Sequence, residues 1–140
     1  MCSSDLNASY KFGTADAAVG LGTGRNDWSV QGDLFRTFGT SLTGFATAGY
    51  RVLGSPAGSA LRDIAFAMVG AGYQFSDALN AGAVVNFRQA TFAGGEPARE
   101  MTAYAGYKLT AKTTLQAYVT RGFSDGSPDW GTGVNLTFGF

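Results

Sequence analysis

The C-terminal stretch Gly131-Thr-Gly-Val-Asn-Leu-Thr-Phe-Gly-Phe140 decides the fold class, because its side chains alternate without interruption. One side of the alternation is large and mostly apolar, and the other is small or polar. The first side carries Trp130, Thr132, Val134, Leu136, Phe138 and Phe140, and the second carries Gly131, Gly133, Asn135, Thr137 and Gly139. A period of two residues indicates a β-strand with one apolar side. We therefore expect an all-β chain whose last strand ends on an aromatic residue.

The composition favours a transmembrane barrel over a soluble domain or a helical membrane protein. Charged residues make up 14% of the chain, whereas a typical soluble domain has about 25%. No run approaches the roughly 20 apolar residues that a membrane helix needs. Alternation dilutes the apolar residues of a barrel, which fits a hydrophobic content of only 45%. The formal net charge is zero, so no basic stripe is available and nucleic acid is not expected as a partner.

Alternation and turn-forming residues divide the chain into nine strand-like segments. They cover residues 6–12, 15–24, 28–38, 41–53, 63–75, 78–90, 100–110, 113–123 and 130–140. Tight turns are expected at Gly13-Thr14, Gly39-Thr40, Ser76-Asp77 and Ala111-Lys112. Longer connections at 54–61, 91–99 and 124–129 contain all three prolines. Short and long connections alternate, except for a short one at residues 25–27, and this asymmetry is typical of outer-membrane barrels.

Aromatic residues fall at both ends of the predicted strands, on the face that continues from Phe140. Near the short turns lie Tyr10, Phe12, Phe38, Tyr73, Phe75, Tyr107, Phe138 and Phe140; near the long loops lie Trp28, Tyr50, Phe87, Phe123 and Trp130. Aliphatic residues occupy the same face between them. Two aromatic girdles around an aliphatic band are typical of a membrane barrel. The alternative is a soluble barrel or sandwich with its apolar face inward.

The opposite face carries most of the charged strand residues and is expected to line the lumen. The candidates are Asp33, Arg51, Asn86, Arg88, Tyr104, Lys108, Gln116 and Tyr118. Together with Glu100, the charged members are candidates for an internal polar network. One segment, 63–75, looks apolar on both faces, and either a bulge or inward packing explains it.

A count of nine strands is odd, whereas single-chain outer-membrane barrels have an even count with both termini in the periplasm. Either the first segment lies outside the barrel, or further strands precede the chain, and we prefer the second explanation. Residues 1–6 resemble translated sequencing-adapter DNA of metagenomic genes. The domain prediction is therefore a non-native segment at 1–6 and the C-terminal portion of an outer-membrane β-barrel at 7–140. Eight or nine strands would be present, out of about twelve if the barrel is longer.

Catalytic chemistry is not expected, because the chain contains no histidine. This removes Ser-His-Asp and Cys-His arrangements, histidine metal sites and the commonest general base. Scattered loop acids at Glu96, Asp125 and Asp129 are interpreted as solvated side chains rather than metal ligands. We predict no enzyme activity, no catalytic residue, no metal site and no cofactor.

Four stretches carry a family resemblance: Phe35-Arg-Thr-Phe-Gly39, Gly49-Tyr-Arg-Val-Leu-Gly54, Thr102-Ala-Tyr-Ala-Gly106 and Arg121-Gly-Phe-Ser-Asp-Gly-Ser-Pro-Asp-Trp-Gly131. Together they resemble the proteobacterial outer-membrane "transporter" proteins that are grouped near the MetA-type barrels of the phenol meta-pathway. The resemblance covers most of residues 28–140. It implies passive transport of small solutes, hydrophobic or aromatic ones among them, across the outer membrane of a Gram-negative bacterium.

The end of the chain also resembles the signal that the barrel-assembly machinery reads on a closing strand. In that resemblance Val134, Leu136, Phe138 and Phe140 carry the signal, and the C-terminus is periplasmic. The expected partners are outer-membrane lipid and lipopolysaccharide, the assembly machinery and a small-molecule solute. The alternative function is a small non-conducting barrel with a structural or adhesion role, because eight strands enclose a space just wide enough for their own side chains.

Overall fold

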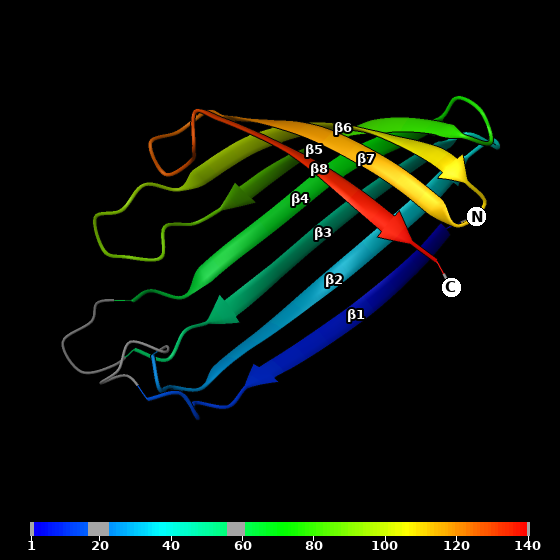
Figure 1. Ribbon diagram of the computed structural model, residues 1–140. Helices are drawn as coiled ribbons and strands as arrows, with labels where there is room; N and C mark the ends of the chain where they lie inside the picture. Colours follow the sequence, from blue (N-terminus) through cyan, green and yellow to red (C-terminus); the bar gives the residue numbers. More distant parts are fainter. Residues whose placement is uncertain (1, 17–22, 56–60, 140) are drawn as a thin grey trace.

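Eight antiparallel strands form a single curved sheet in the computed structural model, which describes residues 2–16, 23–55 and 61–139 (Figure 1). The strands are β1 (Cys2–Lys11), β2 (Asp27–Phe38), β3 (Leu42–Val52), β4 (Ile64–Gln74), β5 (Leu79–Arg88), β6 (Ala98–Thr110), β7 (Thr113–Gly122) and β8 (Trp130–Phe138). Each strand pairs with the next along the chain. The all-β, up-and-down prediction is therefore confirmed. No helix in the described part of the chain is long and apolar enough to cross a membrane.

The connections alternate strictly in length. Residues 12–26, 53–63, 89–97 and 123–129 form the long connections, and residues 39–41, 75–78 and 111–112 the short ones. Short turns follow from local chemistry: Gly39 adopts a φ of 64°, which favours glycine. The Ser76 hydroxyl accepts hydrogen bonds from the N–H groups of Ala78 and Leu79. The long connections lie at one end of the sheet, and β1 begins and β8 ends at the other (Figure 1).

The predicted strand at 15–24 is wrong where the structure describes it. Residues 15, 16, 23 and 24 lie outside any strand, and residues 17–22 lie outside the described residues. Lys11 pairs directly with Asp27, so the predicted turn at Gly13-Thr14 belongs to one long connection. The described strands are therefore eight in number. Because this number is even, the strand count no longer indicates further strands. Residues 2–6, predicted to be non-native, form the first half of β1 and pair with residues 32–36.

The sheet is not closed. In the strand order of the described residues, β1 pairs only with β2, and β8 pairs only with β7. Both edge strands therefore present an unpaired row of backbone N–H and C=O groups in the described structure. The expected closed barrel is thus present only as a curved, open sheet.

The two faces of the sheet differ in exposure, and the apolar face is the outer one. Val69, Val85 and Val134 on the outer face are 58%, 49% and 68% exposed. On the inner face, alternating positions are mostly half-buried, as in the pattern of β4. Ile64 and Ala98 are the only buried apolar side chains in the described residues, at 4% and 7% exposed. The sheet therefore has almost no apolar core of its own.

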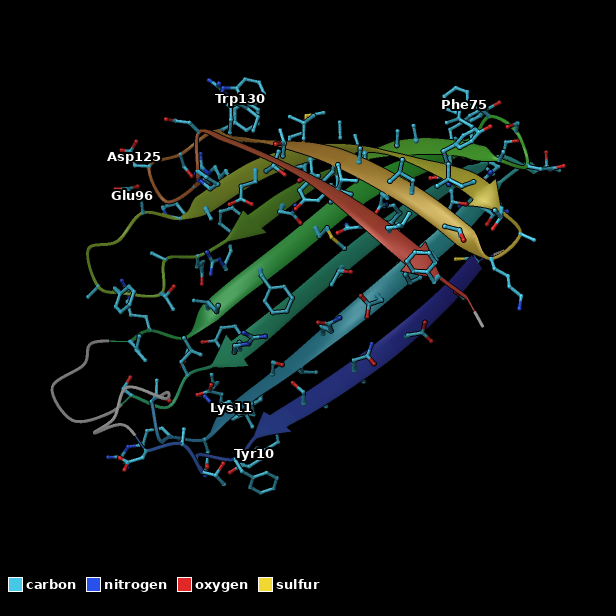
Figure 2. The ribbon with its side chains drawn as sticks, in the orientation of Figure 1. Tyr10, Lys11, Phe75, Glu96, Asp125 and Trp130 are labelled. Carbon is cyan, nitrogen blue, oxygen red and sulfur yellow. The ribbon has the colours of Figure 1, made fainter. Side chains whose placement is uncertain are left out.

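Exposed aromatic side chains lie at both ends of the sheet. Tyr10, Phe12, Trp28, Tyr50, Phe87, Phe123 and Trp130 lie at the long-loop end, and Phe38, Tyr73, Phe75, Tyr107 and Phe138 lie at the short-turn end. Tyr10 and Phe12 were expected at the opposite end; Tyr10 instead pairs with Trp28, because β1 runs toward the long loop. Figure 2 shows Tyr10 and Trp130 at one end and Phe75 at the other. Phe140 lies outside the described residues.

Two outer-face arginines stack on aromatic rings near the strand ends. The guanidinium carbon of Arg36 lies 5.0 Å from the ring centre of Phe38. That of Arg121 lies 4.6 Å from the ring centre of Trp130. Cation–π contacts of this kind attract a guanidinium to an aromatic face. Both of these charged side chains are thus held beside the aromatic ends of the sheet rather than in its aliphatic middle.

Candidate functional site on the concave face

The eight predicted lumen residues all lie on the concave, inner face. Cross-strand pairing links them in register, for example Asp33 with Thr47, Met68 with Asn86, and Tyr104 with Tyr118. The full set is Asp33, Arg51, Asn86, Arg88, Tyr104, Lys108, Gln116 and Tyr118. Partners in an antiparallel pair share a face, so the alternation alone was sufficient to group them. Whether this face is a water-filled lumen stays a prediction.

A cavity of about 700 Å³ lies over the inner face of β2 to β6. Its polar lining includes four of the predicted residues, Asp33, Arg51, Asn86 and Arg88, together with Glu100. Its apolar lining comes mainly from Phe35, Phe45, Ile64, Phe66 and Met68. The cavity is thus amphipathic, with charged groups set among aromatic and aliphatic side chains.

The segment 63–75 is apolar on both faces because some of its apolar side chains pack inward. Ile64, Phe66 and Met68 of β4 face the cavity, whereas Val69 and Tyr73 belong to the exposed outer face. The pairing of β4 with β3 and with β5 is regular along its whole length. Of the two explanations given for this segment, a bulge is therefore excluded.

Asp33 is satisfied by neutral donors. Its carboxylate accepts hydrogen bonds from Nδ2 of Asn7 at 2.8 Å and from Oγ1 of Thr47 at 2.6 Å. Nε2 of Gln31 donates to both carboxylate oxygens, at 3.3 and 3.1 Å. These donors occupy both oxygens, so the Asp33 carboxylate is held close to β1 and β3.

The remaining charged side chains of the cavity have no such partners. Among the described residues, Arg51, Arg88 and Glu100 make no side-chain hydrogen bond and no ion pair within 4.0 Å. The one ion pair in that part of the chain joins Lys11 and Asp27 at 2.8 Å, at the long-loop end. The hydrogen bonds therefore do not join Asp33, Arg51, Arg88, Glu100 and Lys108 into the polar network that we predicted.

Aromatic rings on the inner face lie over glycines of the neighbouring strand. Directly paired positions are Phe66 with Gly49, Phe45 with Gly70, Tyr104 with Gly82, and Tyr118 with Gly133. A Cβ atom added at Gly70 would lie 2.6 Å from Cζ of Phe45, and one at Gly82 would lie 2.5 Å from the Tyr104 hydroxyl. Each ring thus occupies the space above the glycine that a larger side chain would need. The rings lie down against the sheet and leave the space above it open.

Phe45 lies between two cavities. It lines the large one and also a second cavity of about 330 Å³ toward the short-turn end, which Thr43, Gln74, Asn80 and Tyr104 help to line. Its ring centre is 6.4 Å from that of Phe35 on the adjacent strand. Sequence reasoning did not select Phe45 or Phe66 as site residues. The signal that would have found them is the glycine opposite each ring.

The long connections are tied to one another at their end of the sheet. The Ser124 hydroxyl donates to the Pro97 carbonyl at 2.6 Å, and the Arg99 N–H donates to the hydroxyls of Ser124 and Ser127. On the other side, the Gly54 N–H donates to the Asp27 carboxylate at 3.0 Å. Leu61 forms an isolated bridge with Phe92. The described loop residues therefore form a laterally connected rim.

No metal-binding cluster is apparent in the rim or elsewhere: no three His, Cys, Asp or Glu side chains of the described residues gather into a candidate site. Glu96 and Asp125 both lie at the long-loop end (Figure 2).

Comparison with protein-family models, curated proteins and solved structures found no match for this chain.

Proposed function

We propose that the chain forms a β-barrel in the outer membrane of a Gram-negative bacterium, alone or with further strands of a longer protein, and that the barrel conducts small solutes. The observation that carries the proposal is the exposed apolar outer face on a sheet with almost no core. Apolar area in contact with water is unfavourable by about 25 cal/mol per Å². Such a face is stable against lipid, where burial in hydrocarbon replaces contact with water.

Strand length and the position of the aromatic residues support the same proposal. The strands run from 9 to 13 residues, and a tilted transmembrane strand needs roughly 9–11. Aromatic rings at both ends match the two interfaces of a bilayer, where their amphipathic rings settle. Val134, Leu136 and Phe138 on the outer face of β8 keep their proposed role as an assembly signal, and the short turns and the C-terminus would then be periplasmic.

The inner face supports conduction rather than a filled interior. An eight-stranded barrel is ordinarily filled by its own side chains. Here glycines stand opposite the inward aromatic rings, and two cavities remain above them. Phe45 borders both cavities, so the proposed solute path passes over its ring.

The test is swelling of liposomes that contain the full 140-residue chain, in a small uncharged sugar such as arabinose. Swelling should exceed that of protein-free liposomes, and Phe45→Ala should increase it, because the substitution removes the ring between the cavities. Phe123→Ala is the matched control, since Phe123 is an exposed aromatic at the rim, and it should leave swelling unchanged. Permeability no higher than that of empty liposomes would refute the channel.

A non-conducting surface barrel is the second candidate, and the laterally connected rim favours it. Hydrogen bonds between loops hold a surface in one shape, which suits recognition of a partner at the cell exterior. If replacing residues 124–129 by a glycine-serine linker abolished adhesion of cells that display the chain, while liposomes stayed impermeable, this candidate would replace the channel.

A further inference from the structure

The large concave cavity has the chemistry of a site for an amphipathic anion. Its volume of about 700 Å³ falls within the roughly 300–1,000 Å³ of small-molecule pockets. Phe45, Phe66 and Met68 offer an apolar surface on one part of its lining, and Arg51 and Arg88 offer cationic groups on another. A ligand that satisfies both parts needs an apolar body and an anionic end.

The two arginines are placed on either side of β4. Arg51 pairs with Ile64 on one side, and Arg88 pairs with Phe66 on the other. Neighbouring strands lie about 4.8 Å apart, so the two arginine backbones are separated by roughly 10 Å across the strands. A carboxylate that lies above β4 would therefore stand between two guanidinium groups, each of which has the planar fork that binds carboxylates well.

The protein leaves these two charges open to a ligand. Asp27, the acid of β2 nearest to Arg51, attracts its guanidinium but is already paired with Lys11 at 2.8 Å. Asp33, further along β2, accepts hydrogen bonds from Asn7, Gln31 and Thr47. Within the described residues neither arginine has an ion-pair partner. Glu100 is the one further acid of the cavity lining, and its charge limits the excess of positive charge there. A monoanion is therefore a better match than a dianion.

We infer that this cavity binds small monocarboxylates with an aromatic or other apolar body, the carboxylate between Arg51 and Arg88 and the apolar body against Phe45, Phe66 and Met68. This inference rests on the proposed function and names the class of solute that the channel would select. It separates these solutes from neutral aromatic compounds of the same shape, which lack a group for the arginines.

The experiment measures binding to the refolded full chain in detergent micelles, by equilibrium dialysis, for three probes of one shape: 3-phenylpropionate, 3-phenylpropanol and 3-phenylpropylamine. The carboxylate should bind most tightly and the amine least. Arg88→Gln should weaken 3-phenylpropionate binding roughly ten-fold, the loss expected for one charge-assisted hydrogen bond. The same variant should bind 3-phenylpropanol unchanged, which also verifies that its cavity is folded.

Two further variants on the same face give opposite expectations. Glu100→Gln should tighten 3-phenylpropionate binding, because it removes a like charge from the cavity. Lys108→Gln is the matched control, since Lys108 is a cation of the inner face that does not belong to this cavity's lining, and it should have no effect. If Arg88→Gln does not fold, Arg88→Lys serves in its place and should weaken binding by a smaller factor.

Equal affinity for the three probes, or equal loss in Arg88→Gln and Lys108→Gln, would overturn the inference. Its failure is distinguishable from failure of the channel. Selective carboxylate binding by a chain that does not permeabilise liposomes would refute conduction and keep the site. Permeable liposomes without any preference for the carboxylate would refute the site and keep the channel.

Discussion

Glycine residues give the inner face its open space. A residue with a side chain at Gly49, Gly70 or Gly82 would collide with the ring or backbone beside it. The ring would then have to rise from the sheet into the cavity. An added Cβ at these positions would lie within 3 Å of existing atoms, so even small changes there are expected to be costly.

Gly70→Ala is predicted to destabilise the chain by about 1–3 kcal/mol, the usual cost of overpacking. The added methyl group would meet both the Phe45 ring and the Ala83 carbonyl oxygen, at 2.6 and 2.7 Å. Urea unfolding in detergent micelles, followed by tryptophan fluorescence, measures the effect. Gly32→Ala is the control, because nothing lies within 4 Å of a Cβ at Gly32. Equal stability of the two variants would contradict the packing argument.

Asp5 faces another acid across the β1–β2 pair. Its direct partner is Asp33, and like charges at opposed positions are unfavourable. We predict that Asp5→Asn raises the urea midpoint of unfolding, whereas Asp77→Asn in a short turn leaves it unchanged. A lower midpoint for Asp5→Asn would contradict this prediction. It would mean that the Asp5 carboxylate stabilises the β1 register.

At the level of single residues, alternation was enough to group the eight lumen candidates on one face. It did not predict their partners. Asp33 was expected in a network with arginines, yet its oxygens accept hydrogen bonds from Asn7, Gln31 and Thr47. The face on which a side chain lies depends only on whether its position in the strand is odd or even. Its hydrogen-bond partners depend on the register of three neighbouring strands at once.

At the level of elements, the strands from residue 27 onward followed their predicted ranges closely, because large apolar residues mark their alternation. The described error lay at residues 15, 16, 23 and 24, which a glycine-rich alternation had placed in a strand. A glycine-rich stretch specifies strand register only weakly, so its period of two is a poor indicator of a strand. Gly13-Thr14 was then interpreted as a hairpin turn. This interpretation added a ninth strand and placed Tyr10 and Phe12 at the wrong end of the sheet.

The two faces of β8 provide a prediction about the element that ends the chain. Val134 lies near the middle of the outer face, 68% exposed, and Asn135 follows it on the inner face. An arginine on the lipid face at mid-membrane costs roughly 2–4 kcal/mol. Val134→Arg should therefore lower the urea stability of the liposome-folded chain by that amount, and Asn135→Arg should change it little. Equal effects would mean that the outer face of β8 does not contact lipid.

At the level of the whole molecule, the curvature of the sheet could not be deduced from the alternation. Period two assigns side chains to two faces but does not say which face is concave. The structure places the polar, glycine-rich face inside and the apolar face outside. Alternation also could not predict whether the sheet closes, because closure depends on whether β1 pairs with β8. In the described residues these two edge strands are not paired with each other.

The central claim is that the outer face lies in lipid and the inner face in water. Single cysteines at Val85, Asn86, Val134 and Asn135, in a Cys2→Ser background, test it directly in liposomes. Labelling with a charged, membrane-impermeant maleimide should be fast at positions 86 and 135. At positions 85 and 134 it should be at least ten-fold slower, on the order of the labelling of a protein-buried thiol. Equally fast labelling at all four positions would contradict the claim.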